Sequence, residues 1–168
     1  MLILLALSKP GDIVWCLPKR CGGHFSTTEL LKSMGRVPVE MPWNRHKKTI
    51  DLSALKLWEL PQLVLFDLAD PIQPLPVAEI RNITGNKVTI VYDASHVLGL
   101  IAGGHFQLPF EEGADCIIGS THKTFPGPQK AILLFKTKSL GEQTSDRITS
   151  HLISSHGCPI KIPALKWY

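Results

Sequence analysis

Short apolar runs recur along the chain, and each is bounded by turn-forming residues. Their centres are almost continuously apolar rather than alternating, which is typical of strands covered on both faces of a sheet. Strands are predicted over residues 12–17, 37–41, 63–68, 88–92, 116–119 and 131–135. The pattern therefore indicates a sheet with a layer of helices on each side.

The segments between these runs have the spacing of amphipathic helices. Helices are predicted over residues 26–34, 52–58, 77–83, 97–101 and 139–154. The hydroxyl groups of Ser26, Thr27 and Thr28 are suited to cap the first of them. Because strands and helices alternate, we expect an α/β fold with a mostly parallel sheet flanked by helices and right-handed crossovers.

Length and composition fit an ordinary folded protein with one core. The chain has 168 residues, of which 44% are apolar and 19% are charged, and its formal net charge is +4. The densest basic run, residues 45–48, has no aromatic or arginine-rich stripe beside it, so a solvated loop explains it better than a nucleic-acid interface. Trp15, Trp43, Trp58 and Trp167 are assigned to packing, and no nucleic-acid partner is expected.

The chain shows no sign of export or of a membrane anchor. The four cysteines are Cys16, Cys21, Cys116 and Cys158. Their spacing fits neither a zinc ribbon nor a disulfide framework, so we expect reduced thiols, no metal site and a cytoplasmic location. The apolar segment 1–7 is too short to span a membrane and reads as the last turns of a buried helix. Because that helix begins at Met1 without a cap, we expect the chain to be a fragment.

Titratable side chains gather directly after the predicted strands, where ligands bind in open parallel sheets. His24, Asp93, His96 and Lys123 all stand at such positions. A desolvated lysine can react as a neutral amine with a carbonyl group, and a neighbouring carboxylate can keep a pyridine nitrogen protonated. Asp93 and Lys123 therefore match the needs of pyridoxal phosphate chemistry.

Each of these residues also has a simpler interpretation. Lys123 could be a solvated lysine at a strand end, and His24 could be an ordinary loop residue. Asp93 could cap the helix predicted over residues 97–101, which is compatible with a second role. The combination of these residues, rather than any single one, favours the cofactor interpretation.

The motifs occur in a characteristic order. They are Lys9-Pro10-Gly11-Asp12, Gly22-Gly23-His24, Asp93-x-x-His96-x-x-Gly99 and Ser120-Thr121-His122-Lys123-Thr124, followed by Gly127-Pro128. Over about residues 4–134 this pattern resembles serine hydroxymethyltransferase, a fold-type I pyridoxal-phosphate enzyme. The resemblance implies that residues 1–138 form part of the pyridoxal-phosphate-binding large domain of such a transferase. Residues 139–168 are expected to form a helical segment without a clear match.

The resemblance implies catalytic roles for four residues. Lys123 would form a Schiff base with the cofactor, and Asp93 would pair with the nitrogen of its ring. His96 would lie near the phenolic oxygen of the cofactor, and His122 would support the lysine loop.

The resemblance also implies a larger set of cofactor-binding residues. The set comprises His24, Asp93, His96, Ser120, Thr121 and Lys123. His24 would stack on the cofactor ring, and Ser120 and Thr121 would line the pocket beside the lysine. No metal belongs to this set.

The resemblance implies an activity, and some residues of the chain depart from the pattern of the family. The family interconverts serine and glycine with tetrahydrofolate as the one-carbon carrier, and related members perform aldol chemistry on β-hydroxy amino acids. A small amino-acid substrate and a homodimer follow by resemblance. Residues 67–70 replace the Ser-Ala-Tyr element of the family, so that Asp70 stands near a cofactor or phosphate position. Gln129 replaces an arginine, which bears on the transfer reaction more than on cofactor binding.

Two other interpretations remain open at this point. The chain could be a truncated, catalytically inactive paralogue that acts as an interaction module. It could also belong to a different fold-type I enzyme, an aminotransferase or a decarboxylase, because these also use aspartate and lysine on neighbouring strands.

Overall fold

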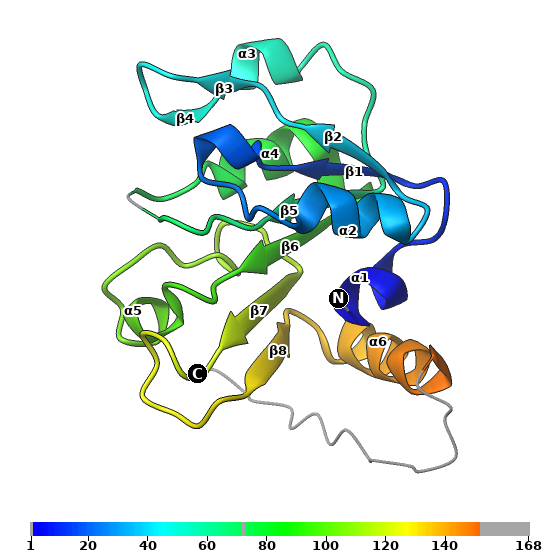
Figure 1. Cartoon of the computed structure of the whole chain (residues 1–168), viewed down its shortest axis with the longest axis vertical. Helices are drawn as coiled ribbons and strands as arrows, with labels where there is room; N and C mark the ends of the chain where they lie inside the picture. Colours follow the sequence, from blue (N-terminus) through cyan, green and yellow to red (C-terminus); the bar gives the residue numbers. More distant parts are fainter. Residues whose placement is uncertain (1, 72, 152–168) are drawn as a thin grey trace.

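A six-stranded sheet forms the centre of the molecule (Figure 1), and the computed structural model describes residues 2–71 and 73–151. The strands are β1 (Ile13–Cys16), β2 (Val37–Glu40), β5 (Leu63–Phe66), β6 (Thr89–Asp93), β7 (Cys116–Ser120) and β8 (Ala131–Phe135). Their order is β2-β1-β5-β6-β7-β8, and every neighbouring pair is parallel except β7 and β8. The predicted α/β fold with a mostly parallel sheet is confirmed, and all six predicted strands are present.

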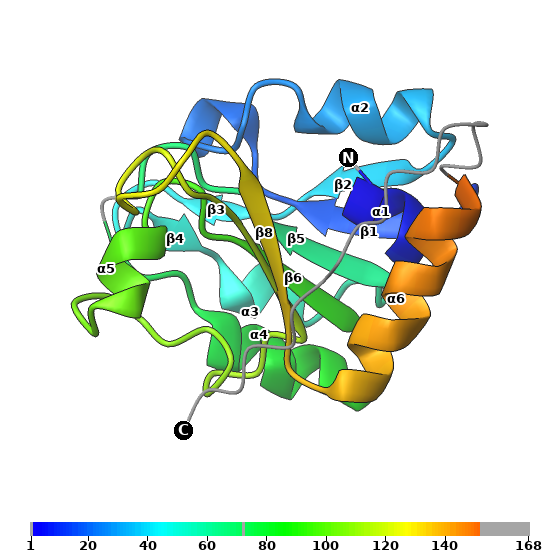
Figure 2. The same cartoon turned by 90° about the horizontal axis from the view of Figure 1, so that it is seen from below.

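Helices cover both faces of this sheet. The helices are α1 (Leu2–Leu7), α2 (Thr27–Ser33), α3 (Leu52–Leu55), α4 (Val77–Thr84), α5 (Leu98–Ala102) and α6 (Lys138–His151), with 3-10 turns η1 (Lys19–Cys21) and η2 (Gly85–Lys87). Figure 2 shows α2 on one side of the sheet and α3 and α4 on the other. The predicted helix over residues 139–154 corresponds to α6, and its residues 152–154 lie outside the described residues.

Alternation along the central strands divides the core into two clusters. Cys16, Leu65 and Val91 pack with α1 and α2 on one face. Phe66 and Tyr92 pack with α3, α4 and α5 on the other face. Full burial of a side chain of this size stabilises the fold by roughly 1.5–3 kcal/mol. These two clusters hold the carboxyl ends of β1, β5, β6 and β7 in fixed positions.

The edge strands differ from the sequence prediction. We expected every strand to be covered on both faces, but β2 and β8 are only partly buried. Val37 in β2, for example, is 46% exposed. An apolar run therefore indicates a strand here, although it does not indicate a central one.

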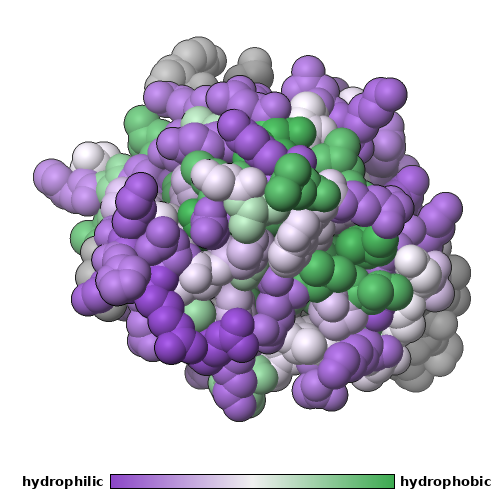
Figure 3. All heavy atoms as spheres, turned by 90° about the horizontal axis from the view of Figure 1, so that it is seen from above, coloured by the Kyte–Doolittle hydropathy of each residue, from purple (hydrophilic) through white to green (hydrophobic). Residues whose placement is uncertain are grey.

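A short hairpin, which the sequence pattern did not predict, lies beside the main sheet. It consists of β3 (Trp43–Asn44) and β4 (Thr49–Ile50), which pair in antiparallel fashion. The basic run 45–48 forms its exposed turn, so the prediction of a solvated loop is confirmed. Asn44 Oδ1 accepts hydrogen bonds from the backbone N–H groups of His46 and Lys47, at 3.1 Å and 2.9 Å. Figure 3 shows a largely polar surface, broken by small apolar patches, on the side of this hairpin.

Helix α1 is buried, as predicted, and two arginines hold its C-terminal end. Arg36 Nε donates to Ser8 Oγ at 3.0 Å, and Arg36 Nη2 donates to the carbonyl of Ser8. Arg147 Nη1 on α6 donates to the carbonyl of Ala6 at 2.9 Å. Together these contacts tie α1 to the end of α2 and to α6.

Arg81 on α4 aligns the starts of β6 and β7. Its guanidinium donates to the carbonyls of Val88 and Gly113 and to Asp115 Oδ2. The same carboxylate oxygen accepts the backbone N–H of Ile90 at 2.8 Å. Because one guanidinium binds the segments that precede both strands, it holds β6 and β7 in register with one another. The carboxyl ends of these strands carry the candidate site.

Trp15 and Trp58 pack in the core, and the cysteines of the described chain form no disulfide. Trp15 is 1% exposed and meets Trp58 edge to face, with ring centroids 6.1 Å apart, which confirms the packing role. Cys16, Cys21 and Cys116 have free thiols. Trp167 and Cys158 lie outside the described residues. Among the helices of residues 2–71 and 73–151, none is long and apolar enough to cross a membrane.

Candidate active site

The loops that follow β1, β5, β6 and β7 meet at one edge of the sheet (Figure 1). Parallel strands require this, because their carboxyl ends share an edge. His24, Asp93, His96 and Lys123 all belong to these strand ends or loops. The sequence-based expectation that they gather in one region is therefore met by the topology.

Lys123 and His96 are in direct contact. Lys123 Nζ lies 2.9 Å from His96 Nε2. Burial, and then the positive charge of Lys123, lower the pKa of His96 below its ordinary value. The imidazole is therefore neutral near pH 7, and Nε2 can accept a hydrogen bond from the lysine if the ring proton is on Nδ1.

Three further side chains lie within electrostatic range of His96. Asp93 and Asp70 raise the pKa of His96 and so oppose the larger effects of burial and Lys123. His24 lowers this pKa and so adds to them. Four loops and the end of β6 thus place two histidines, two carboxylates and a lysine around one point. This arrangement includes Asp70, which the sequence had marked only as a departure from the family pattern.

Asp93 ends β6 and shapes the turn that carries His96. Its Oδ1 accepts the backbone N–H of Ser95 at 2.8 Å. Helix α5 begins later, after Val97, and has no side-chain cap. The interpretation of Asp93 as the cap of this helix is therefore wrong, because its carboxylate accepts the N–H of Ser95, which precedes the helix.

His24 is held by its backbone and by its neighbours. Its N–H donates to the carbonyl of Asp67 at 3.1 Å, and its Nδ1 lies 3.0 Å from Ser26 Oγ. Ser26 makes no side-chain hydrogen bond to cap α2, contrary to the prediction, because its hydroxyl faces the imidazole instead. Phe25 stacks on the histidine ring with centroids 4.7 Å apart. A Cβ atom on Gly23 would stand 2.4 Å from the carbonyl oxygen of Leu17, so only glycine permits this path of the chain.

The loop that carries Lys123 is closed by Thr121. This threonine is 7% exposed, and its Oγ1 donates to the carbonyls of Pro128 and Lys130. Its backbone carbonyl accepts the N–H of Gly127 at 2.8 Å. Thr121 therefore fixes the lysine loop internally, and its hydroxyl is already used.

The remaining members of the predicted set have fewer contacts. Ser120 is half-buried at the end of β7, and His122 is exposed. Neither side chain makes a hydrogen bond to another part of the chain that the structure describes. Their implied roles stay predictions.

Helix α5 presses against the lysine loop. The N–H of Gly99 donates to Thr124 Oγ1 at 3.3 Å. A Cβ atom on Gly99 would lie only 2.2 Å from the carbonyl oxygen of Thr124. Real Cβ atoms do not approach so closely, so glycine at this position permits the contact between the turn of His96 and the loop of Lys123.

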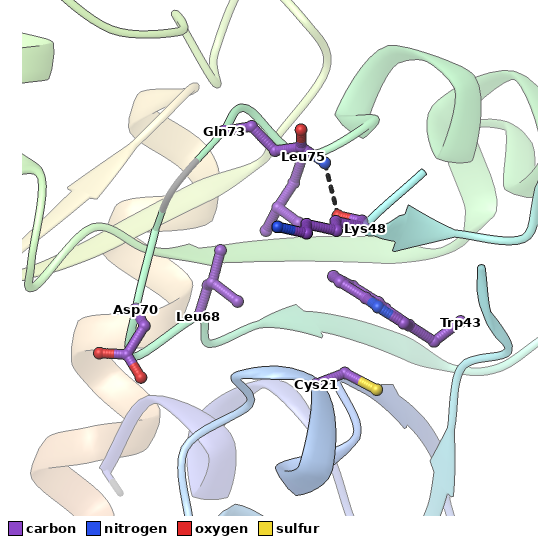
Figure 4. A pocket seen from close by; sticks show the side chains of 7 residues that line it. All are labelled: Cys21, Trp43, Lys48, Leu68, Asp70, Gln73 and Leu75. Atoms are coloured by element: carbon purple, nitrogen blue, oxygen red, sulfur yellow. Dashed lines mark hydrogen bonds between the residues drawn. The ribbon is translucent and has the colours of Figure 1, made fainter. Parts of the chain in front are cut away.

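A mainly apolar pocket of about 160 Å³ lies between the β3–β4 hairpin and the loop after β5 (Figure 4). Its lining consists of Cys21, Trp43, Lys48, Leu68, Asp70, Gln73 and Leu75. Gln73 Nε2 donates to the carbonyls of Lys47 and Lys48 and holds the hairpin over this pocket. Lys48 has a left-handed backbone with φ of 50°. The pocket could not be expected from the sequence, because one of its walls, with Trp43 and Lys48, comes from the hairpin that was not predicted.

Asp67 is a second group that sequence reasoning missed. It follows β5 directly, is 4% exposed, and has no hydrogen-bond partner at Oδ1 or Oδ2 among the described residues. Burial, and to a smaller extent the charge of Asp93, raise the pKa of Asp67 from 3.8 to about 6. The Thr27 hydroxyl and the backbone N–H groups of Asp67 and Leu17 oppose part of this shift, although none of them meets the geometry of a hydrogen bond.

The raised pKa of Asp67 predicts a specific dependence of stability on pH. Between pH 4 and pH 6 the folded state holds the proton of Asp67 while the unfolded state releases it, so this residue makes the free energy of unfolding fall as pH rises. This stability is lost progressively as pH rises through the folded pKa, and above that pKa the free energy of unfolding is lower by about 3 kcal/mol than below the unfolded pKa. Relative to wild type, Asp67→Asn is expected to gain about 2–3 kcal/mol in urea unfolding between pH 4 and pH 7.

The matched control for this measurement is Asp146→Asn on α6. Asp146 is exposed, so its removal changes the charge equally without relieving burial. A difference between Asp67→Asn and wild type that stays constant over this pH range would contradict the prediction.

The fold and this site define an α/β protein with a lysine, two histidines and carboxylates at the carboxyl edge of a parallel sheet. A family model, "Serine hydroxymethyltransferase", matches residues 1–156. The chain belongs to the serine hydroxymethyltransferase family, which confirms the family suggested by its motifs. The match extends past Pro128, where the last of the quoted motifs ends, and past residue 138.

Two curated relatives illustrate this membership. The chain is 42% identical over 153 residues to a fluorothreonine transaldolase of Streptantibioticus cattleyicolor, covering 89% of this chain and 24% of the relative. It is 37% identical over 162 residues to a serine hydroxymethyltransferase of Aeropyrum pernix, covering 92% of this chain and 36% of the relative. The chain thus spans about a quarter to a third of the length of these relatives.

A solved structure supports the same conclusion. The crystal structure of L-threonine transaldolase from Pseudomonas fluorescens superposes with a TM-score of 0.79 at 35% identity. The similarity covers 90% of this chain and 36% of that one. The α/β fold predicted from the sequence is thereby confirmed a second time.

Proposed function

We propose that this chain binds pyridoxal phosphate and contributes to an enzyme that performs serine hydroxymethyltransferase-like aldol chemistry on small amino acids. The observation that carries the proposal is the contact between Lys123 Nζ and His96 Nε2 at 2.9 Å, within electrostatic range of Asp93. The relatives are named serine hydroxymethyltransferases and transaldolases, which supports a hydroxy amino acid as the substrate. Tetrahydrofolate as co-substrate, a homodimer and a cytoplasmic location belong to the same proposal.

The residues present fit this cofactor. Lys123 is exposed, so the desolvation that its place after a buried strand suggested is not seen, and its primary amine is open at the edge of the sheet. Asp93 is half-buried, and only its Oδ1 is used by the described chain, which leaves Oδ2 able to face a ring nitrogen. Gly23 allows the backbone at His24 to approach closely. The donor set thus combines an amine, a carboxylate and an aromatic ring, as a substituted pyridine aldehyde requires.

Bound pyridoxal phosphate would supply an aldehyde for a primary amine and a ring that accepts an electron pair from the α-carbon of an amino acid. Lys123 would provide the amine. Asp93 would hold a proton at the ring nitrogen, and His96, neutral near pH 7, would accept a proton or a hydrogen bond from Lys123 Nζ. His24 would cover one face of the ring.

Asp70 favours an amino acid in this region. It is exposed and close enough to His96 to raise the pKa of that imidazole. A carboxylate there repels a phosphate group and attracts an ammonium group. We therefore place the phosphate away from Asp70 and the amino group of the substrate on its side.

Covalent trapping tests the proposed function. The 168-residue chain is mixed with pyridoxal phosphate, reduced with borohydride, digested and mapped by mass spectrometry. We expect a visible absorption band before reduction and a phosphopyridoxyl group on Lys123 afterwards. Pyridoxamine phosphate, which has no aldehyde, serves as the control and should give neither.

The outcome also separates the proposal from its alternatives. Absence of the label on Lys123, or labelling only of other exposed lysines, would favour the inactive paralogue that acts as an interaction module. If Lys123 is labelled, assays of half-transamination against retro-aldol cleavage distinguish an aminotransferase from the aldol activity proposed here.

A further inference from the structure

Asp67 is an unusual group for the interior of a protein. It is 4% exposed and neither carboxylate oxygen has a hydrogen-bond partner among the described residues. Buried carboxyl groups are normally paired or hydrogen-bonded, because an isolated buried charge is costly. A side chain that forgoes such partners at the carboxyl edge of a sheet is a candidate for a role in binding.

The register of the sheet places Asp67 beside Asp93. In the pairing of β5 with β6, Leu65 is opposite Val91 and Phe66 is opposite Tyr92, so the next step brings Asp67 level with Asp93. Residues two apart on a strand share a face, and Leu65 and Val91 both belong to the cluster under α1 and α2. Both carboxyl groups therefore project from the same face of neighbouring strands, which lie about 4.8 Å apart.

No positively charged side chain of the described residues acts on the pKa of Asp67, and the cation of the site, Lys123, contacts His96 instead. Cys16 on β1 occupies the same face, and burial, followed by the charge of Asp67, raises the pKa of its thiol to about 12. The nearest group on α2, Thr27, is uncharged. The charge of Asp93 makes a small contribution to the raised pKa of Asp67, in keeping with the placement of the two groups by the register.

A metal ion is a poor candidate for the partner of this pair. Among residues 2–71 and 73–151, no group of three or more histidine, cysteine, aspartate or glutamate side chains could hold one. Calcium, for comparison, takes about six to eight oxygen ligands. One positively charged N–H group, in contrast, can be shared by two carboxylates.

Resting on the proposed function, we propose that Asp67 is a second carboxyl group of the ring-nitrogen site and acts with Asp93 to favour a protonated heteroaromatic nitrogen there. Asp93 makes the contact with the nitrogen. Asp67 is a positioning residue that adds negative charge behind Asp93 and so strengthens the preference for a cationic ring. The ligand class is a pyridine-type base, and an uncharged ring of the same shape should not sense Asp67.

The first experiment needs no cofactor. The side-chain carboxyl groups of aspartate are labelled with ¹³C, and the resonance of Asp67, assigned from its absence in Asp67→Asn, is titrated in wild type, Asp93→Asn and Asp146→Asn. We expect the apparent pKa of Asp67 to fall in Asp93→Asn and to stay unchanged in Asp146→Asn. An unchanged pKa in Asp93→Asn would overturn the pairing of the two groups.

The second experiment asks whether the pair senses a ring nitrogen. Tryptophan fluorescence reports the dissociation constants of pyridoxal phosphate and of its carbocyclic analogue, in which a C–H group replaces the nitrogen. In Asp67→Asn we expect binding of pyridoxal phosphate to weaken about tenfold, the effect of one pKa unit, and binding of the analogue to stay as in wild type. Asp146→Asn should leave both constants unchanged.

The outcomes separate this inference from the proposed function. Equal weakening of both compounds in Asp67→Asn would mean a purely structural role and would overturn the inference, as would no change in either. If wild type binds neither compound, the proposed function fails and the assignment of the ligand fails with it. The ¹³C titration still decides, in that case, whether Asp67 and Asp93 form a pair.

Discussion

Replacement of Lys123 by methionine is expected to abolish the borohydride-stable attachment of pyridoxal phosphate while the fold is retained. Lys123 is exposed, and among the described residues the hydrogen-bond partner of its side chain is His96 Nε2 at 2.9 Å. Exposed substitutions of this kind usually change stability by less than about 0.5 kcal/mol. Methionine preserves the length of the side chain but has no nucleophilic nitrogen, so the loss should be complete rather than partial.

The matched control is Lys130→Met at the other end of the same loop. Lys130 is also exposed, and it contributes a backbone carbonyl to Thr121 that the substitution does not remove. Intact mass after reduction and a thermal melt are recorded for both variants. Equal labelling of wild type and Lys123→Met would show that the cofactor is attached elsewhere, and the assignment of Lys123 would be wrong.

Gly99→Ala is expected to disturb both stability and labelling. The added methyl group would stand 2.2 Å from the carbonyl oxygen of Thr124 and 2.6 Å from its carbon, so α5 and the lysine loop must separate. Forced insertions of this kind typically cost about 1–3 kcal/mol. For a chain of this size that cost lowers Tm by roughly 2–4 °C for each kcal/mol. We also expect slower labelling of Lys123, because the contact with His96 depends on this packing.

Gly103→Ala, at the end of the same helix, makes the same chemical change with more space. Its Cβ atom would meet its nearest neighbours at 3.3 Å, and Gly103 has no left-handed backbone. A small change in Tm and normal labelling are expected for it. If the two alanine variants behave alike, the close approach of Gly99 to the lysine loop does not govern the site.

The central strands could be predicted from the sequence because their burial leaves little choice of residue. Each of β1, β5 and β6 is an apolar run interrupted at both ends by turn-forming or polar residues. The hairpin of Trp43–Asn44 and Thr49–Ile50 was not predicted, because two-residue strands have no periodicity to detect. The pocket that the hairpin covers could not be predicted for the same reason.

The candidate site was predicted in part for a similar reason. His96 and Lys123 stand just after apolar strands, and parallel topology brings strand ends together. The strand predicted over residues 63–68 includes Asp67, but burial of its carboxyl group without hydrogen-bond partners could not be predicted, because aspartate side chains are mostly exposed. The role of Gly99 was equally hidden, because the atom that excludes a side chain belongs to Thr124, far along the sequence.

Strand β2 has one further property that follows from its register. The N–H groups of Val37 and Met41 donate to carbonyls of the β1 segment, at 2.9 Å each, so Pro38 lies at a position whose nitrogen faces away from the sheet. A proline has no N–H to offer a foreign strand, and the exposed carboxylate of Glu40 follows on the same margin. In the described chain this margin is thus poorly suited to strand addition, which protects the protein against edge-to-edge aggregation.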